Sequence, residues 1–178
     1  MDIGVISVRY ARALLKAALA AKQEEQVYGE MQTLAQSYVH VPELRFTINN
    51  PMLEKSKKEN LLLTACGKNP SKLTSDFIHL VLQEGRESVL QFMANSYITL
   101  YRKQKNLISG RLITAAAVAP ATEQKLRQMV ESKTRGTVEF QTEINPEIIG
   151  GFVLEYDTYR MDASVKTKLK KILSELQK

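Results

Sequence analysis

The side chains most capable of chemistry in this sequence are few and far apart. Its only histidines are His40 and His79, and its only cysteine is Cys66. Catalysis and metal binding need several such groups at suitable spacing, and neither histidine has a carboxylate or cysteine at ligand spacing along the chain. We therefore expect both histidines to lie on helix surfaces. Cys66 is expected to be a small buried side chain near a helix end rather than a reactive thiol.

Two further features resemble parts of known sites. The Gly150-Gly151 pair has the composition of a phosphate-binding loop, but it precedes a predicted strand rather than a helix N-terminus, so a backbone bend is the better interpretation. Asp157 and Asp162 bracket a predicted hairpin, where turn and cap roles are commoner than an acid–base pair. With no phosphate loop, nucleophile elbow or zinc pattern in the sequence, we predict no catalytic residues, no cofactor and no metal site, and hence no enzyme.

The composition is that of a folded, soluble protein. Hydrophobic residues make up 44% of the 178 positions and charged residues 25%, which suffices for an ordinary core. The net charge of +6 is spread along the chain rather than gathered in one basic tract, which argues against a nucleic-acid partner. Residues 14–21 resemble a secretion signal, but basic residues interrupt this region and we expect a core helix there. No run approaches the ~20 apolar residues of a membrane span.

The first hundred residues have the periodicity of consecutive helices. Apolar residues recur at helical spacing over residues 11–19 and again over residues 27–38. Pro42 suits the first turn of a short helix, Asn50-Pro51 suits a break, and Gly67 and Gly85 suit the ends of the helices that precede them. Short loops between these helices predict a bundle of six helices over residues 1–105.

Near residue 106 the periodicity changes. Residues 107–118 form a β-prone run that we expect Gly110 to break, and a helix is predicted from Pro120 to Gly136. Residues 138–144 alternate as in a strand with one wet face, a further strand follows the two glycines, and Ser164 is the predicted cap of a terminal helix. The predicted fold class is α+β: an N-terminal six-helix bundle, then a smaller C-terminal α/β domain over residues 106–178 with a short sheet and a terminal helix.

Two of the predicted helices carry more apolar surface than their own core needs. The first combines a narrow basic stripe with small and apolar residues on a second side, and the apolar residues of the fifth cover about half of its circumference. One explanation is that both helices are central in the bundle. The other is a groove between them, in which alanines let an amphipathic helix of another protein approach closely. The lysines of the terminal helix likewise either face solvent or meet an acidic helix or anionic lipid.

Several short motifs, in this order and spacing, resemble one family. Arg9-Tyr10-Ala11-Arg12-Ala13-Leu14 resembles the Tyr-Ala-x-Ala opening of the delta subunits of F-type ATP synthases, relatives of the mitochondrial oligomycin-sensitivity-conferring protein. Asn50-Pro51 and Gly85-Arg86 stand where that family has a break and a turn. The most specific block runs from residue 149 to Asp162-Ala163-Ser164, although Ala163 stands where the family often has glycine. The resemblance covers essentially the full length.

The resemblance implies a non-catalytic stator subunit of a rotary, proton-translocating ATP synthase. The helical domain would bind the N-terminal helix of an alpha subunit of the catalytic head, between helices one and five. The C-terminal domain would bind b-type subunits of the peripheral stalk. The chain would then lie on the cytoplasmic side of the bacterial inner membrane, held there only through the complex. The candidate contacts to the alpha-subunit helix are Tyr10, Ala13, Leu14, Ala17, Phe77, Ile78, Leu80 and Val81. The alternative function is a basic nucleic-acid-binding module, which a sequence pI near 9.4 would suit.

Overall fold

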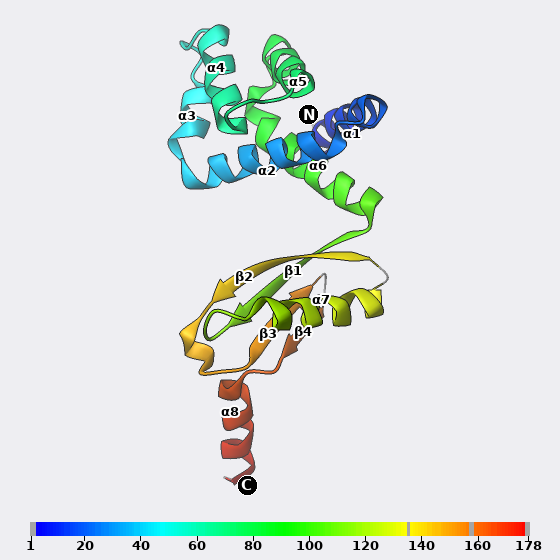
Figure 1. The fold of residues 1–178 in the computed structure, drawn as a ribbon. Helices are drawn as coiled ribbons and strands as arrows, with labels where there is room; N and C mark the ends of the chain where they lie inside the picture. The colour runs from blue at the N-terminus through cyan, green and yellow to red at the C-terminus, as the bar shows by residue number, and fades with distance from the viewer. Residues whose placement is uncertain (1–2, 135, 157–158, 177–178) are drawn as a thin grey trace. The chain divides into compact units, whose positions relative to one another are not determined.

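The computed structural model describes residues 3–134, 136–156 and 159–176, and the chain divides into two units, Met1–Gln104 and Lys105–Lys178 (Figure 1). The described residues of unit 1 form helices joined by short loops, without a strand, and unit 2 combines a sheet with two α-helices. This arrangement confirms the predicted α+β class, with the sheet confined to the smaller C-terminal part.

Unit 1 is built from six α-helices and one short 3₁₀ turn within the described residues. Two of these helices are followed by a glycine, as predicted. Gly67 and Gly85 adopt positive φ values of 126° and 63°, a conformation that glycine adopts more easily than other residues. Tyr97, Met31 and Ile78 are among the largest fully buried side chains. The elements are α1 (Ile3–Ala21), α2 (Glu24–His40), α3 (Glu43–Asn49), α4 (Lys55–Cys66), α5 (Lys72–Gln83), η1 (Glu87–Val89) and α6 (Leu90–Lys105).

A buried carboxylate fixes the start of α5. Glu30 on α2 is only 8% exposed, and its oxygens accept hydrogen bonds from the backbone N–H of Ser71 at 2.7 Å and from the Ser71 hydroxyl at 2.8 Å. The same hydroxyl oxygen accepts a hydrogen bond from the backbone N–H of Thr74 and so caps α5. Because the cap is itself anchored, α5 is tied to α2 at its first turn.

Unit 2 contains a four-stranded sheet in the order β2-β1-β3-β4. Strand β1 is parallel to β2 and antiparallel to β3, and β3 and β4 form a hairpin. Helix α7 packs through Val130 against Leu112, Val138 and Leu154, which form the core of the unit. The elements are β1 (Leu107–Thr114), α7 (Pro120–Thr134), β2 (Thr137–Ile144), η2 (Pro146–Ile148), β3 (Phe152–Tyr156), β4 (Tyr159–Asp162) and α8 (Val165–Leu176).

The predicted break at Gly110 is wrong. Strand β1 continues through this residue, which is buried opposite Phe140 on β2. A Cβ atom at position 110 would lie 2.7 Å from the Phe140 ring, closer than side-chain carbons approach in proteins. Glycine is therefore present so that an aromatic side chain can cross the neighbouring strand, and not because the strand ends.

Helix α8 begins at a side-chain cap. The Ser164 hydroxyl oxygen accepts a hydrogen bond from the backbone N–H of Thr167 at 3.2 Å, as predicted. Asp162 accepts hydrogen bonds from the backbone N–H of Ser164 and from the Thr167 hydroxyl, and these bonds hold the pKa of its carboxyl below the usual range. Asp162 thus has a capping role, while Asp157 lies outside the described residues.

Candidate partner-binding surfaces

The chemically capable side chains do not converge in the structure. His40 is exposed at the end of α2, and exposed His79 on α5 lies 3.2 Å from the carboxylate of Glu59 on α4. Cys66 is 3% exposed, and burial raises the pKa of its thiol to about 12, so it is unreactive near neutral pH. Within residues 3–134, 136–156 and 159–176, no group of three or more potential metal ligands comes together.

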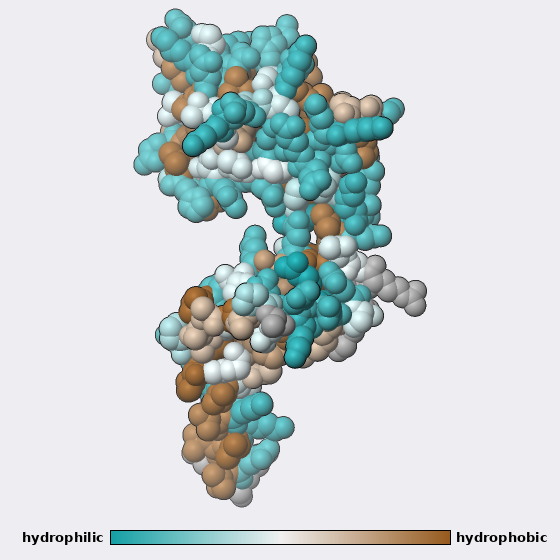
Figure 2. Space-filling view, in the orientation of Figure 1, coloured by the Kyte–Doolittle hydropathy of each residue, from teal (hydrophilic) through white to brown (hydrophobic). Residues whose placement is uncertain are grey.

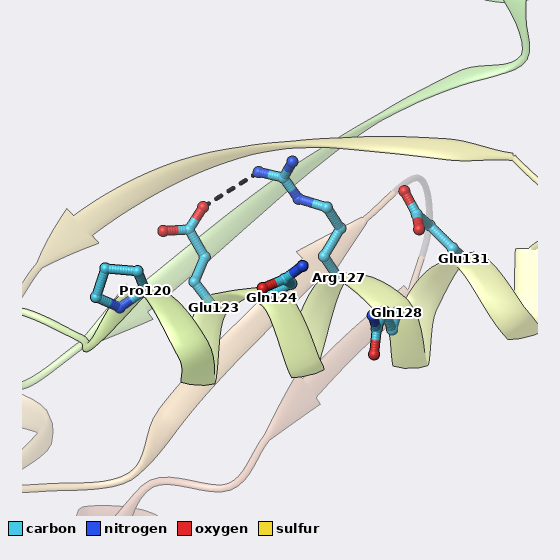
Figure 3. Close-up of a pocket in the computed structure, with 6 residues that line it drawn as sticks. All are labelled: Pro120, Glu123, Gln124, Arg127, Gln128 and Glu131. Atoms are coloured by element: carbon cyan, nitrogen blue, oxygen red, sulfur yellow. Dashed lines mark hydrogen bonds and ion pairs between the residues drawn. The ribbon is translucent and has the colours of Figure 1, made fainter.

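A polar hollow on the outer side of α7 also lacks the features of a site. Figure 3 shows its lining side chains projecting from consecutive turns of one helix. Glu123 and Arg127 form an ion pair at 3.2 Å with helical i,i+4 spacing. Side chains that project from one face of a single helix do not enclose a reactant. The stronger candidates for a functional site are exposed apolar surfaces.

The first such surface lies where α1 meets α5. Tyr10 of α1 packs edge to face on Phe77 of α5, with ring centroids 6.4 Å apart and an interplanar angle of 65°. Arg86, just after α5, places its guanidinium 5.4 Å from the centre of the Tyr10 ring. Ala13 and Ala17 follow Tyr10 at helical spacing, and both are exposed. We call Tyr10, Ala13, Ala17, Phe77 and Leu80 the α1/α5 surface.

The structure separates the eight predicted contact residues into two groups. Ala13, Ala17 and Leu80 are exposed, Leu80 to 45%, and Tyr10 is half-buried. The other four are almost completely buried and hold the two helices in unit 1: Leu14, Phe77, Ile78 and Val81. A partner can reach the first group directly, whereas the second group supports it, with Phe77 lying beneath Tyr10.

Two partly exposed residues extend the α1/α5 surface and are absent from the predicted contacts. Ile6 precedes Tyr10 by four positions, and Leu73 precedes Phe77 by four. Residues four apart on a helix lie on the same side, so this spacing was a signal that could have identified both. With them, apolar and small residues line more than two turns of each helix.

The second surface is the apolar side of α8. None of the described residues of this helix is buried, yet Leu169, Ile172 and Leu173 lie on one side with exposures of 52%, 53% and 58%. Figure 2 shows apolar side chains gathered along that side of the terminal helix. We call the α8 face the set formed by Ile149, Val165, Leu169, Ile172, Leu173 and Leu176. Ile149, which precedes the helix and is 63% exposed, carries no periodic signal and was missed.

Contiguous exposed apolar surface of this kind normally marks contact with another molecule. In the described part of the chain, no helix has the length and apolar character needed to cross a bilayer. The chain therefore presents two candidate docking surfaces, one in each unit.

Comparison with known proteins shows the family to which this chain belongs. The family model "ATP synthase delta (OSCP) subunit" matches residues 6–176. The ATP synthase subunit delta of Phocaeicola vulgatus is 47% identical over 97% of this chain and 94% of its own length. That of Parabacteroides distasonis is 44% identical over 97% and 96%. A chain in the cryo-EM structure of the Toxoplasma gondii mitochondrial ATP synthase hexamer shares the fold, with a TM-score of 0.63, 22% identity and 97% coverage of both chains. These matches confirm the resemblance found in the motifs, and the chain belongs to the ATP synthase delta (OSCP) subunit family.

Proposed function

We propose that this chain is the stator subunit that ties the catalytic head of a rotary, proton-translocating ATP synthase to its peripheral stalk. Membership of the ATP synthase delta family indicates the complex to which the chain would belong. The two exposed apolar surfaces are the places where it would attach to other subunits. The observation that carries the proposal is their distribution, one on each unit. A linker needs two independent binding surfaces, and it needs no group with tuned acidity.

On the head side, the α1/α5 surface receives the N-terminal helix of an alpha subunit. Ala13 and Ala17 leave the backbone of α1 accessible, so an incoming helix can pack at the short interaxial distance that small residues permit. Tyr10 and Leu80 provide the apolar contacts on either side, and the Tyr10–Phe77 contact makes the surface preformed. A preformed surface lowers the ordering cost of binding.

On the stalk side, the α8 face receives b-type subunits. Its apolar residues recur at i, i+4, i+7 and i+8 from Val165, which is the pattern of a helix that packs on another helix. Lys166 and Lys170 border this apolar side, so a stalk helix with acidic residues beside its own apolar stripe fits best. The lysines of α8 would thus meet an acidic partner helix rather than lipid.

The task of such a linker is mechanical. Ion flow turns the rotor, and the head would turn with it unless the head were held to the stalk. Slow dissociation under load is then the requirement, and nanomolar binding corresponds to about −12 kcal/mol. The chain would lie on the cytoplasmic side of the bacterial inner membrane, attached through the complex.

The head-side proposal is tested with Ala13→Asp in the full chain. Calorimetry with a peptide of the alpha subunit N-terminal helix from the same organism should show at least about a hundredfold weaker binding, because a carboxylate would be buried against an apolar helix. Gln36→Asp, on the exposed side of α2, adds the same charge and should bind as the unchanged protein does. Equal affinity of the Ala13 variant would remove this surface from the proposal.

A further inference from the structure

Helix α1 carries an unusual row of side chains beside the α1/α5 surface. Arg9, Ala13, Lys16 and Ala20 are spaced i, i+4, i+7 and i+11, so they lie on one side of the helix, and all four are exposed. Arg9 and Lys16 are therefore direct helical neighbours of Ala13, where the partner helix is proposed to pack. Any helix lying on Ala13 and Ala17 must pass within reach of both cations.

The basic residues of α1 lack an acidic partner among the residues that the structure describes. The helix from Ile3 to Ala21 contains no acidic residue, so it has no internal ion pair. In the described part of the chain, Arg9, Arg12 and Lys16 form no salt bridge or side-chain hydrogen bond, whereas Lys58, Arg111, Arg127, Arg160 and Lys166 each lie within 4.0 Å of a carboxylate. The opposite helix is mixed in sign, with Lys72 and Asp76 both exposed.

We propose that Arg9 and Lys16 select the partner: the helix bound at the α1/α5 surface carries acidic residues along the edge that faces α1. This inference rests on the proposed head-side function and adds the charge and the orientation of the partner. An acidic edge on one side fixes which way the helix is rolled about its axis. It also disfavours helices with basic residues on that edge, because like charges brought together at an interface cost free energy.

Arg86 extends the positive edge at one end of this surface. Its guanidinium is held over the Tyr10 ring, and Tyr10 in turn rests on Phe77. The charge is therefore placed by packing rather than left on a freely moving side chain, which lowers the entropy lost when a carboxylate pairs with it. Arg9, Lys16 and Arg86 together present one sign of charge along the α1 side.

The test uses the full chain and the alpha subunit N-terminal peptide, with Arg9→Glu combined with Lys16→Glu. Binding should weaken at least about tenfold, since two attractions become two repulsions at partly exposed positions. Lys103→Glu combined with Lys125→Glu makes the same change in net charge on exposed parts of α6 and α7 and should bind normally. Far-UV circular dichroism should show unchanged helix content in both variants.

A peptide with its acidic residues replaced by lysine separates charge matching from damage to the surface. It should bind poorly to the unchanged chain and regain affinity for the Arg9/Lys16 variant. Unchanged binding of the Arg9/Lys16 variant to the natural peptide would overturn the acidic edge and leave the docking surface standing, provided that Ala13→Asp abolishes binding. If Ala13→Asp also binds normally, the head-side function itself fails.

Discussion

Lys58 and Glu87 form a largely buried salt bridge that joins α4 to η1. Their nitrogen and oxygen atoms are 2.8 Å apart, and the side chains are only 5% and 17% exposed. Glu87→Gln would leave the Lys58 ammonium buried without its counter-charge. We expect the free energy of unfolding at neutral pH to fall by about 3 kcal/mol, measured by urea denaturation. Lys57→Gln, on an exposed pair with Glu54, should cost less than about 1 kcal/mol.

The same pair determines how acid affects unit 1. Burial alone would raise the pKa of Glu87, but the hydrogen bond from Lys58 and the positive charges of Lys58 and Lys55 hold it below its ordinary value of 4.5. A depressed folded-state pKa means that the carboxylate stabilises the fold fully above 4.5 and loses this effect as pH falls through the lower value. Stability of the unchanged chain should therefore decline in that acid range, and the Glu87→Gln variant should show a flatter decline. Parallel acid profiles would contradict this role.

At the scale of elements, the sequence correctly predicted those helix ends that depend on residues nearby in the chain. Pro42, Gly67 and Ser164 act within a turn of their own position, so the helix ends they mark are where the structure has them. The prediction at Gly110 was wrong because the residue that requires a glycine there is Phe140, which lies thirty positions along the chain and on another strand. A single residue cannot reveal a contact that only the sheet creates.

The candidate contacts show the same limit. Helical spacing identified α1 and α5 as unusually apolar, but it could not distinguish Leu14 and Ile78, which fill the core, from Ala13 and Leu80, which are exposed. That distinction depends on where α2 and α6 pack, and no period in α1 or α5 encodes it. For α8 the helical spacing predicted which side is apolar, but the exposure of that side became known only from the structure, in which no element of the described residues covers it.

Because the apolar side chains of α8 are exposed, substitutions there should weaken stalk binding without destabilising the fold. Leu169 is 52% exposed and lies in the middle of the α8 face, so Leu169→Ser should change the stability of the chain by less than about 1 kcal/mol. Its binding to purified b subunits should weaken at least about tenfold, because an apolar contact at the centre of a helix pair is lost. Lys171→Ser, on the opposite side of the helix, is the control and should bind normally. A large loss of stability in the Leu169 variant would instead show that α8 packs on its own unit.

At the scale of the whole molecule, the proposed function determines how a load passes between the head and the stalk. If the head is held through the α1/α5 surface and the stalk through the α8 face, the two attachments act in series. A load passes through both or through neither, so loss of either one disconnects the head. Two attachments acting in parallel to the same partner would instead share the load, and each would compensate in part for loss of the other.

This difference is measurable in membranes that carry the assembled synthase. Ala13→Asp and Leu169→Ser should each reduce ATP-driven ion pumping while the head retains ATP hydrolysis, because both substitutions leave the subunits of the head unchanged. Since a chain with one broken link is already disconnected, the double variant should pump no worse than the weaker single variant. Parallel attachment predicts that the two losses multiply, so that the double variant falls well below both. The ratio of pumping to hydrolysis in the four proteins therefore distinguishes a linker from a subunit bound twice to one partner.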